Sequence, residues 1–199
     1  MARPRLFTDD EILAATQSCI FEHGPGVSTT TIAERAGTSQ AVLFKRFGTK
    51  EKLIIRALRQ PMQRNPVSDL LRKGPEDGPI RPQLIGLGIT MIGMMRRMVP
   101  CLAMLHAAGL GSDHENALDD SPAIRVRSLL VDWFQHALDD GRIRGVNPHI
   151  IAVGFLGMLH ERPFRETIVR DTELTCTDEE YVTEVVDSLL FGIAASEEP

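Results

Sequence analysis

The stretch TTTIAERAGTSQAVLFKRFGTKEKL, residues 29–53, decides the fold. Its apolar residues recur at helical spacing in two short runs, and Gly37 and Gly48 stand where these runs end. We expect one helix over about 29–36 and a second helix from residue 38 or 39 to about residue 47. Two short helices joined by a tight glycine turn form a helix-turn-helix, whose second helix lies in the major groove of DNA.

The residue types within these two helices suit that role. Ile32, Ala36, Leu43 and Phe47 can form a small core between the helices, and Ala33 is small where they approach each other. The second helix begins with residues that can read base edges, because glutamine can bond adenine twice, serine bonds several bases and an alanine methyl contacts thymine. Threonine hydroxyls and a lysine at helix N-termini suit phosphate. The residues concerned are Ser39, Gln40, Ala41, Thr29, Thr30 and Lys50.

Positive charge is concentrated around this segment. Residues 35–59 carry seven basic residues and one acid, although the whole chain has a net charge of −5. Residues 1–60 have a net charge of +3 and residues 61–199 a net charge of −8. A solvated charged face would explain the charge by itself, and it is the helix pattern that favours a surface facing nucleic acid.

The segment TTTIAERAGTSQAVLFKRFGTKEKLI closely resembles the N-terminal DNA-binding domain of the tetracycline-repressor (TetR) family of transcriptional regulators. The likeness covers about residues 8–58 and includes a threonine-rich entry, Ile-Ala, Ala-Gly-x-Ser, Leu-Phe-x-x-Phe and Lys-Glu-x-Leu. Phe44 replaces the usual tyrosine, and Ala41 stands near a frequent glycine. The resemblance implies a DNA-contacting set of Thr29, Thr30, Ser39, Gln40, Ala41, Phe44, Lys45, Arg46 and Lys50.

The rest of the chain also predicts helices. Thr8 and Glu11 form a capping-box pattern at the start of a first helix, and Thr49 can cap a fourth. Proline-rich residues 60–83 predict a linker, so we expect domains at 1–60 and 61–199. Apolar-periodic segments follow at about 82–99, 100–109, 122–140, 148–162 and 178–195. These features predict an all-α protein of about nine helices, with a three-helix DNA-binding domain and a larger helical ligand-binding and dimerisation domain.

Composition excludes several other classes of protein. The three cysteines are far apart in the sequence, which argues against a disulfide framework, thiolate metal sites and thiol redox pairs. The longest uncharged apolar segment has 14 residues, fewer than the roughly 20 that a membrane span needs. With no secretory signal pattern, the sequence predicts a cytoplasmic protein. We expect no cofactor, no metal and no catalytic residues; the LHERPF segment lacks the second histidine of a zinc protease site.

The resemblance implies that the C-terminal domain binds a small effector and forms a homodimer. Methionine lines adaptable pockets, so an apolar ligand is expected among Met94, Met98, Met104, Trp133, Phe134, Phe155 and Met158, with an ordinary methionine-filled core as the alternative. Two apolar stripes predict the dimer interface, although both could instead face the domain core. The interface residues expected are Ile151, Phe155, Met158, Val182, Val186, Leu189 and Leu190.

These observations predict a repressor that binds a palindromic double-stranded operator as a dimer and is released by a small apolar effector. Two other classes stay open: a helical enzyme with 82–199 as its catalytic body, and a helical adaptor that binds protein through its C-terminal helices. A steep salt dependence of binding to DNA separates the regulator from both alternatives, because only phosphate contacts produce it.

Overall fold

A computed structural model describes residues 7–63, 66–110, 122–145, 147–171 and 175–192. Within these ranges the protein is all-α, with no strand, as the sequence predicts. The chain divides into two compact units. Unit 1 comprises residues 1–64 and 100–115, and unit 2 comprises residues 65–99 and 116–199. The functional division at residue 60 is a different partition and stays a prediction.

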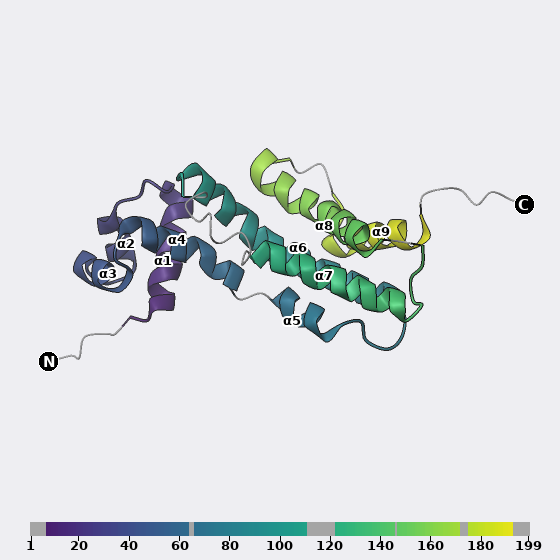
Figure 1. Cartoon of the computed structure of the whole chain (residues 1–199). Coiled ribbons are helices and arrows are strands. Elements are labelled where there is room, and N and C mark those ends of the chain that lie inside the picture. The colour runs from purple at the N-terminus through teal and green to yellow at the C-terminus, as the bar shows by residue number, and fades with distance from the viewer. Residues whose placement is uncertain (1–6, 64–65, 111–121, 146, 172–174, 193–199) are drawn as a thin grey trace, which may run out of the picture. The chain divides into compact units, whose positions relative to one another are not determined.

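Unit 1 contains α1 (Asp9–His23), α2 (Thr29–Arg35), α3 (Gln40–Phe47) and α4 (Lys50–Gln63), with α1 packed against α2 and α4 (Figure 1). The capping box at the start of α1 is present: Glu11 N–H donates to Thr8 Oγ1 (3.2 Å) and Thr8 N–H donates to Glu11 Oε2 (2.8 Å). α1 ends at Gly24, whose φ of +79° favours glycine. Each cap therefore fixes an end of the helix that supports α2 and α4.

The core of unit 1 is built from the inward faces of these helices. Its buried members include Ile12, Ile20, Leu53, Ile54 and Leu58. Cys19 and Cys101 are also fully buried, and burial raises the pKa of both thiols. Gln17 Nε2 donates to Cys101 Sγ (3.3 Å), so α1 is joined to the segment that follows residue 100.

Unit 2 contains α5 (Pro66–Lys73), the first part of α6 (Ile80–Ala107), α7 (Pro122–Asp139), α8 (Pro148–Phe164), a π-helical turn η1 (Arg165–Val169) and α9 (Asp178–Phe191). α7 and α8 lie side by side, and α5 packs against α7 (Figure 1). Gly88 allows α6 to approach the last two helices, because a Cβ there would lie 2.6 Å from Val182 Cγ1 and 3.4 Å from Phe155 Cζ. A side chain at this position would force the core apart.

Two features of this region differ from the sequence prediction. The segments 82–99 and 100–109 form a single helix, α6, which continues through Pro100. α5 occupies the middle of the predicted linker, residues 60–83. Proline is well tolerated at the first position of a helix, where Pro66 stands, and Val67 and Leu71 are buried one turn apart. Burial of this short stripe explains why a proline-rich segment is helical.

α6 also has the length and apolar composition of a membrane-spanning helix, with a mean hydropathy of 1.3 over its most apolar window. However, 56% of that window is buried inside the protein. The residues it buries include Leu84, Met91 and Ile92, which pack within unit 2. This burial is the property of a core helix, and we treat α6 as one.

Ion pairs fasten α6 to η1 and α9 within unit 2. At one end of this connection, Arg81 donates two hydrogen bonds to Asp187 (2.6 and 2.8 Å). Arg96 is bidentate to Glu166 (2.7 and 2.9 Å) and to Asp178 (2.5 and 2.7 Å), the other end. Hydrogen bonds from Arg96 hold the pKa of the Glu166 and Asp178 carboxyls below their usual range.

Arg162 adds a second cation to this cluster. Its guanidinium is almost fully buried, and Nε lies 3.0 Å from Asp178 Oδ1 without an aligned hydrogen bond. Its other nitrogens donate to Cys176 O (2.6 Å) and Cys176 Sγ (3.3 Å), and its carbon lies 5.4 Å from the Tyr181 ring centroid. The two arginines and two carboxylates balance in charge, so the cluster is an internal clamp.

Candidate nucleic-acid interface

α2 and α3 form the helix-turn-helix that the sequence predicts. After α2, the N–H of Thr38 donates to Ala33 O (2.9 Å) and the N–H of Gly37 donates to Glu34 O (3.0 Å), which closes a tight turn. Gly37 has a φ of +66°, and a Cβ there would lie 2.8 Å from the Phe7 ring. Glycine is therefore needed at this turn for backbone conformation and for space.

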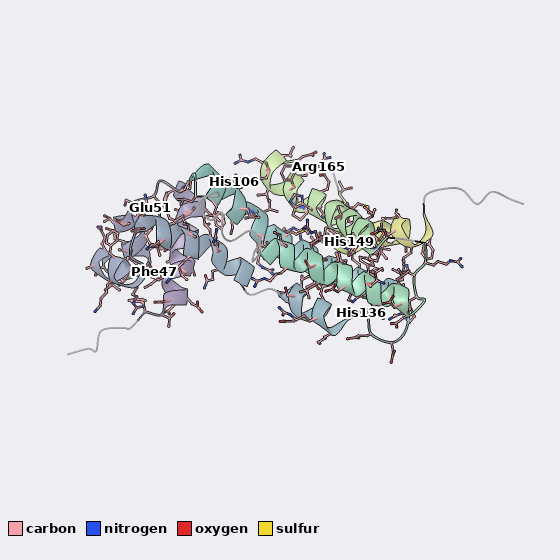
Figure 2. The ribbon with its side chains drawn as sticks, viewed as in Figure 1. Phe47, Glu51, His106, His136, His149 and Arg165 are labelled. Atoms are coloured by element: carbon pink, nitrogen blue, oxygen red, sulfur yellow. The ribbon has the colours of Figure 1, made fainter. Side chains whose placement is uncertain are left out.

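The small core between the two helices is also as predicted. Ile32, Ala36, Leu43 and Phe47 each expose 6% or less of their surface. Figure 2 labels Phe47, over whose ring the Arg56 guanidinium lies at 5.9 Å from the centroid. This packing fixes the angle between α2 and α3, and so fixes which side chains α3 exposes.

Gln40, at the start of α3, is hydrogen-bonded to two threonines at the start of α2. Thr29 Oγ1 donates to Gln40 Oε1 (3.1 Å), and Gln40 Nε2 donates to Thr30 Oγ1 (2.7 Å). The amide keeps one N–H and further acceptor capacity for another partner, and the Thr30 hydroxyl keeps its own proton to donate. The sequence patterns gave no sign of this Gln40–threonine link between the two helices.

The other residues at the head of α3 divide into a cap and an exposed face. The side chain of Ser39 accepts from the Val42 N–H (3.3 Å) and so caps the helix. Ala41, Phe44 and Lys45 are exposed, and Phe44 exposes 44% of its surface. Lys45 has no hydrogen-bond or ion-pair partner among the described residues. Its ammonium is therefore available to a partner outside the chain.

Arg46 and Lys50 are directed toward neighbouring segments of unit 1. Arg46 Nη1 donates to Phe7 O (2.5 Å) and to Asp9 Oδ1 (3.1 Å), and Lys50 Nζ donates to Gly26 O (3.1 Å). A carbonyl satisfies the donor but brings no negative charge, so Lys50 keeps its full charge at the start of α4. The sequence could not have shown that the N-terminal segment reaches Arg46.

The aromatic part of the predicted ligand set comes together in unit 2. Trp133 and Phe134 meet edge to face at 5.4 Å, and Phe134 meets Phe155 in the same way at 6.2 Å. Met94 and Met98 are buried, and Met158 is half-buried. Met104 lies within residues 100–115, which belong to unit 1, so the structure does not place it with the other six residues.

Trp133 and Phe134 each line a hollow in unit 2. The Trp133 hollow has a volume of about 320 Å³ and lies between α5, α6 and α7; its lining includes Leu70, Lys73, Glu76, Gly86, Leu87 and Thr90. The Phe134 hollow has a volume of about 200 Å³, and its further lining residues are Leu84, Arg142, Ile143, Arg144, Ile151, Leu189 and Leu190. A third hollow, of about 420 Å³, lies between α7 and α8 and includes Arg127 and Val153.

The predicted dimer interface needs correction at three positions. Phe155, Val182 and Val186 are completely buried within the protomer, and the first two pack against Gly88. A second copy could not reach them unless the core opened. Ile151, Met158, Leu189 and Leu190 are half-buried. The strongly exposed apolar residues of these helices are different ones: Ile150 (71%), Val153 (55%) and Phe191 (73%).

Three of the histidines lie on three different helices. Figure 2 labels His106 on α6, His136 on α7 and His149 on α8. In the part of the chain that the structure describes, no three histidine, cysteine, aspartate or glutamate side chains are grouped closely enough to hold a metal ion.

Comparison with known proteins adds a family model that matches part of the chain, and a fold. Residues 12–57 match the model of bacterial regulatory proteins of the tetR family. The curated proteins that were searched include no match to this chain. The chain resembles several solved structures. Because their sequences are 21% identical to it or less, this likeness shows a shared fold and no more.

One such structure is a putative TetR-family transcriptional regulator from Mesorhizobium loti (TM-score 0.73, 21% identity, covering 92% of this chain and 94% of that one). The fatty acid degradation regulator FadR from Bacillus halodurans has a TM-score of 0.69 and 18% identity, covering 97% and 98% of the two chains. FadR from Bacillus subtilis, in complex with stearoyl-CoA, has a TM-score of 0.71 and 14% identity, covering 94% and 100%.

Proposed function

We propose that this chain is a TetR-family repressor that binds a palindromic operator as a homodimer and releases it when a small effector binds. Residues 12–57 match the model of the tetR family of bacterial regulatory proteins, and the chain has the fold of solved TetR-family regulators. The helix-turn-helix carries the proposal. Its turn is closed by backbone hydrogen bonds, and α3 exposes Gln40, Ala41, Phe44 and Lys45 on one short helix.

The contacts in unit 1 support a division of labour. Gln40, with one N–H left to donate, is the candidate base reader, and the Thr30 hydroxyl beside it can donate to a base or a phosphate. Lys45 and Lys50 supply charge for phosphates, together with the free N–H groups at the helix N-termini. Phosphate contacts supply affinity for any sequence, and base contacts supply preference among sequences.

Selection of bound duplexes from a random DNA pool tests the proposal. The expected result is a palindromic consensus whose half-sites are about one helical turn, or a multiple of it, apart. A helical enzyme or a protein-binding adaptor would enrich no sequence. Enrichment of a single half-site without a palindrome would retain DNA binding and contradict the dimer.

Exposed apolar residues on α8 support the homodimer. Ile150, Val153 and Gly157 recur at spacings of three and four, and so share one face of the helix. A Cβ at Gly157 would meet nothing within 4 Å, so this face is open to a second helix. Self-pairing about a two-fold axis would bury it in both copies.

Light scattering tests the dimer with two matched variants. Val153→Glu places a charge on the proposed contact and should shift a species of about 44 kDa toward the 22.0 kDa protomer. Ile89→Glu, an exposed residue of α6 in the same unit, should leave the mass unchanged. A wild-type protein that is monomeric at low micromolar concentration, or equal effects of the two variants, would contradict this interface.

The effector is proposed to bind unit 2 beside the Trp133–Phe134 pair. Each of these side chains lines a hollow, and apolar walls with a few polar groups are typical of small-molecule sites. The stearoyl-CoA complex of a structural neighbour supports an effector with an apolar chain. Effector and operator must weaken each other by the same factor, and a ligand that perturbs Trp133 fluorescence without changing operator affinity would contradict its role as inducer.

A further inference from the structure

The Phe134 hollow has an apolar interior built from four helices. Leu84 from α6 and Phe134 from α7 are buried at its floor, exposing 1% and 2% of their surfaces. Ile151 from α8, with Leu189 and Leu190 from α9, forms half-buried walls. An alkyl chain of short to medium length would replace water against these side chains, which is favourable in proportion to the apolar area covered.

Two arginines from the segment between α7 and α8 stand at this hollow. Arg142 is held in place, because its guanidinium donates to the carbonyls of Glu76 (2.7 Å) and Gly78. These carbonyls take two of the N–H groups of the guanidinium, leave others to donate and do not neutralise its charge. Arg144 is exposed, and within the part of the chain that the structure describes it has no partner and no carboxylate side chain lines the hollow.

The Trp133 hollow lacks this charge pattern. Its lining includes Lys73 and Glu76, whose charges are opposite, and its neutral polar groups are Gln83 and Thr90. Gln83 is occupied, because its amide bonds the backbone of Glu76 and Pro79. Charge therefore separates the two hollows, although both have apolar interiors beside the same aromatic pair.

We propose that the Phe134 hollow binds an anionic amphiphile, with a carboxylate at Arg142 and Arg144 and an alkyl chain against Leu84 and Phe134. A guanidinium presents paired N–H donors that match a carboxylate. The proposal rests on the proposed function, because it names the chemical class of the effector. It adds which hollow is used and that the effector carries a negative charge.

Isothermal titration calorimetry with decanoate and decan-1-ol tests whether the hollow prefers a negatively charged head group. The two probes share a chain length and differ in the charge of the head group. The full chain should bind decanoate about fivefold or more tightly than the alcohol, since an ion pair at an exposed rim is modest in strength. Equal affinities for the two probes, or no binding of decanoate, would overturn the proposal.

Three variants locate the site. Arg144→Glu should weaken decanoate binding about fivefold or more and leave decan-1-ol binding unchanged. Arg127→Glu makes the same charge change at the third hollow and should leave both affinities unchanged. Gly86→Phe fills the Trp133 hollow, where a Cβ would meet nothing within 4 Å, and should also leave decanoate binding unchanged. Arg142 is kept, because its removal would leave two carbonyls without a donor.

The outcomes separate this inference from the proposed function. Loss of decanoate binding in Gly86→Phe, or equal effects of Arg144→Glu and Arg127→Glu, would overturn the choice of hollow while operator binding stayed intact. A wild-type protein that enriches no DNA sequence but binds decanoate at Arg144 would instead overturn the proposed function and keep the site. Circular dichroism and thermal unfolding of each variant show whether it is folded.

Discussion

Two lysines of unit 1 and two arginines of unit 2 differ in the partners that they bond. In unit 2, Arg96 and Arg81 are each bidentate to carboxylates of η1 and α9, so carboxylates of the same chain neutralise their charges at partly exposed sites. In unit 1, Lys45 has no partner among the described residues and Lys50 bonds a carbonyl that leaves its charge intact. These arginines thus fasten unit 2 internally, whereas the two lysines leave positive charge on unit 1 that no carboxylate bonds. What distinguishes a binding cation from a structural one is its partner.

Arg142 and Arg144 differ from Arg81 and Arg96, although all four belong to unit 2. Their charges are not met by carboxylates at the Phe134 hollow, so they resemble the cations of unit 1 more than their neighbours Arg81 and Arg96. Net charge hides this difference, because residues 61–199 sum to −8. The partners of each cation therefore say more about where an anionic ligand can bind than the net charge of the region does.

Removal of the Arg96 clamp should have the largest effect on stability. Arg96→Met leaves Glu166 and Asp178 facing each other with Arg162 as the remaining cation. Breaking a buried ion pair costs about 3–5 kcal/mol, and partial exposure of this cluster reduces the expected loss to about 2–3 kcal/mol. Urea unfolding of the wild-type protein and the variant measures this loss of stability. An unchanged midpoint would show that the clamp does not contribute to stability.

Loss of the Gln40 side chain should have the next largest effect, on operator affinity. Gln40→Ala removes a candidate bidentate contact worth about 1–3 kcal/mol on the preferred operator, with little change on random DNA. Equal losses on both sequences would remove Gln40 as a reader of bases.

A double-mutant cycle with Thr30→Val asks whether the Gln40–threonine link acts as a unit. The two side chains share a 2.7 Å hydrogen bond, so their effects on operator affinity should be non-additive. Gln40→Ala, Thr30→Val and the double variant are compared in the same filter-binding or fluorescence assay. Additive losses would mean that the two residues meet DNA independently.

Acid should weaken unit 2 through the same clamp. The pKa values of Glu166 and Asp178 are lowered in the fold, chiefly by hydrogen bonds from Arg96. Their contribution is therefore fully present above their unfolded pKa values, near pH 4, and is lost as the pH falls through the lower folded values. Urea unfolding at pH 6 and pH 3 should show this loss, and Arg96→Met should reduce the difference. A wild-type protein equally stable at both values would contradict it.

Replacement of a single lysine in unit 1 should have the smallest effect, a modest loss of DNA affinity. Lys45→Ala and Lys50→Ala should each weaken binding to all duplexes alike and reduce the salt slope by about one unit per contact. Lys73→Ala in unit 2 is the matched control and should leave the slope unchanged. A slope that does not respond to Lys45 or Lys50 would remove that residue from the interface.

Unit 1 could be predicted well because its signals are local. Gly37 and Gly48 stand at the ends of α2 and α3. Thr8, Ser28 and Ser39 cap the N-termini of α1, α2 and α3, respectively. The positions of Arg46 and Gln40 could not be predicted, because their partners lie 10 or more residues away and no periodic pattern encodes such contacts.

Unit 2 was harder to predict because its helices are apolar on more than one face. α8 carries the fully buried Phe155 and the exposed Ile150 and Val153, so periodicity cannot tell core from interface. The interface predicted from the sequence therefore includes the core residues Phe155, Val182 and Val186. α5 was missed because proline usually marks a linker, whereas here Pro66 begins a helix that buries Val67 and Leu71.

The salt dependence of binding to a selected operator and to random duplex tests the central claim most directly. If the uncompensated cations of unit 1 face DNA, log affinity falls linearly with log salt concentration on both duplexes. The operator should be bound about a thousandfold or more tightly than random DNA at physiological salt. A chain that binds both duplexes equally, or whose affinity does not depend on salt, would contradict the account.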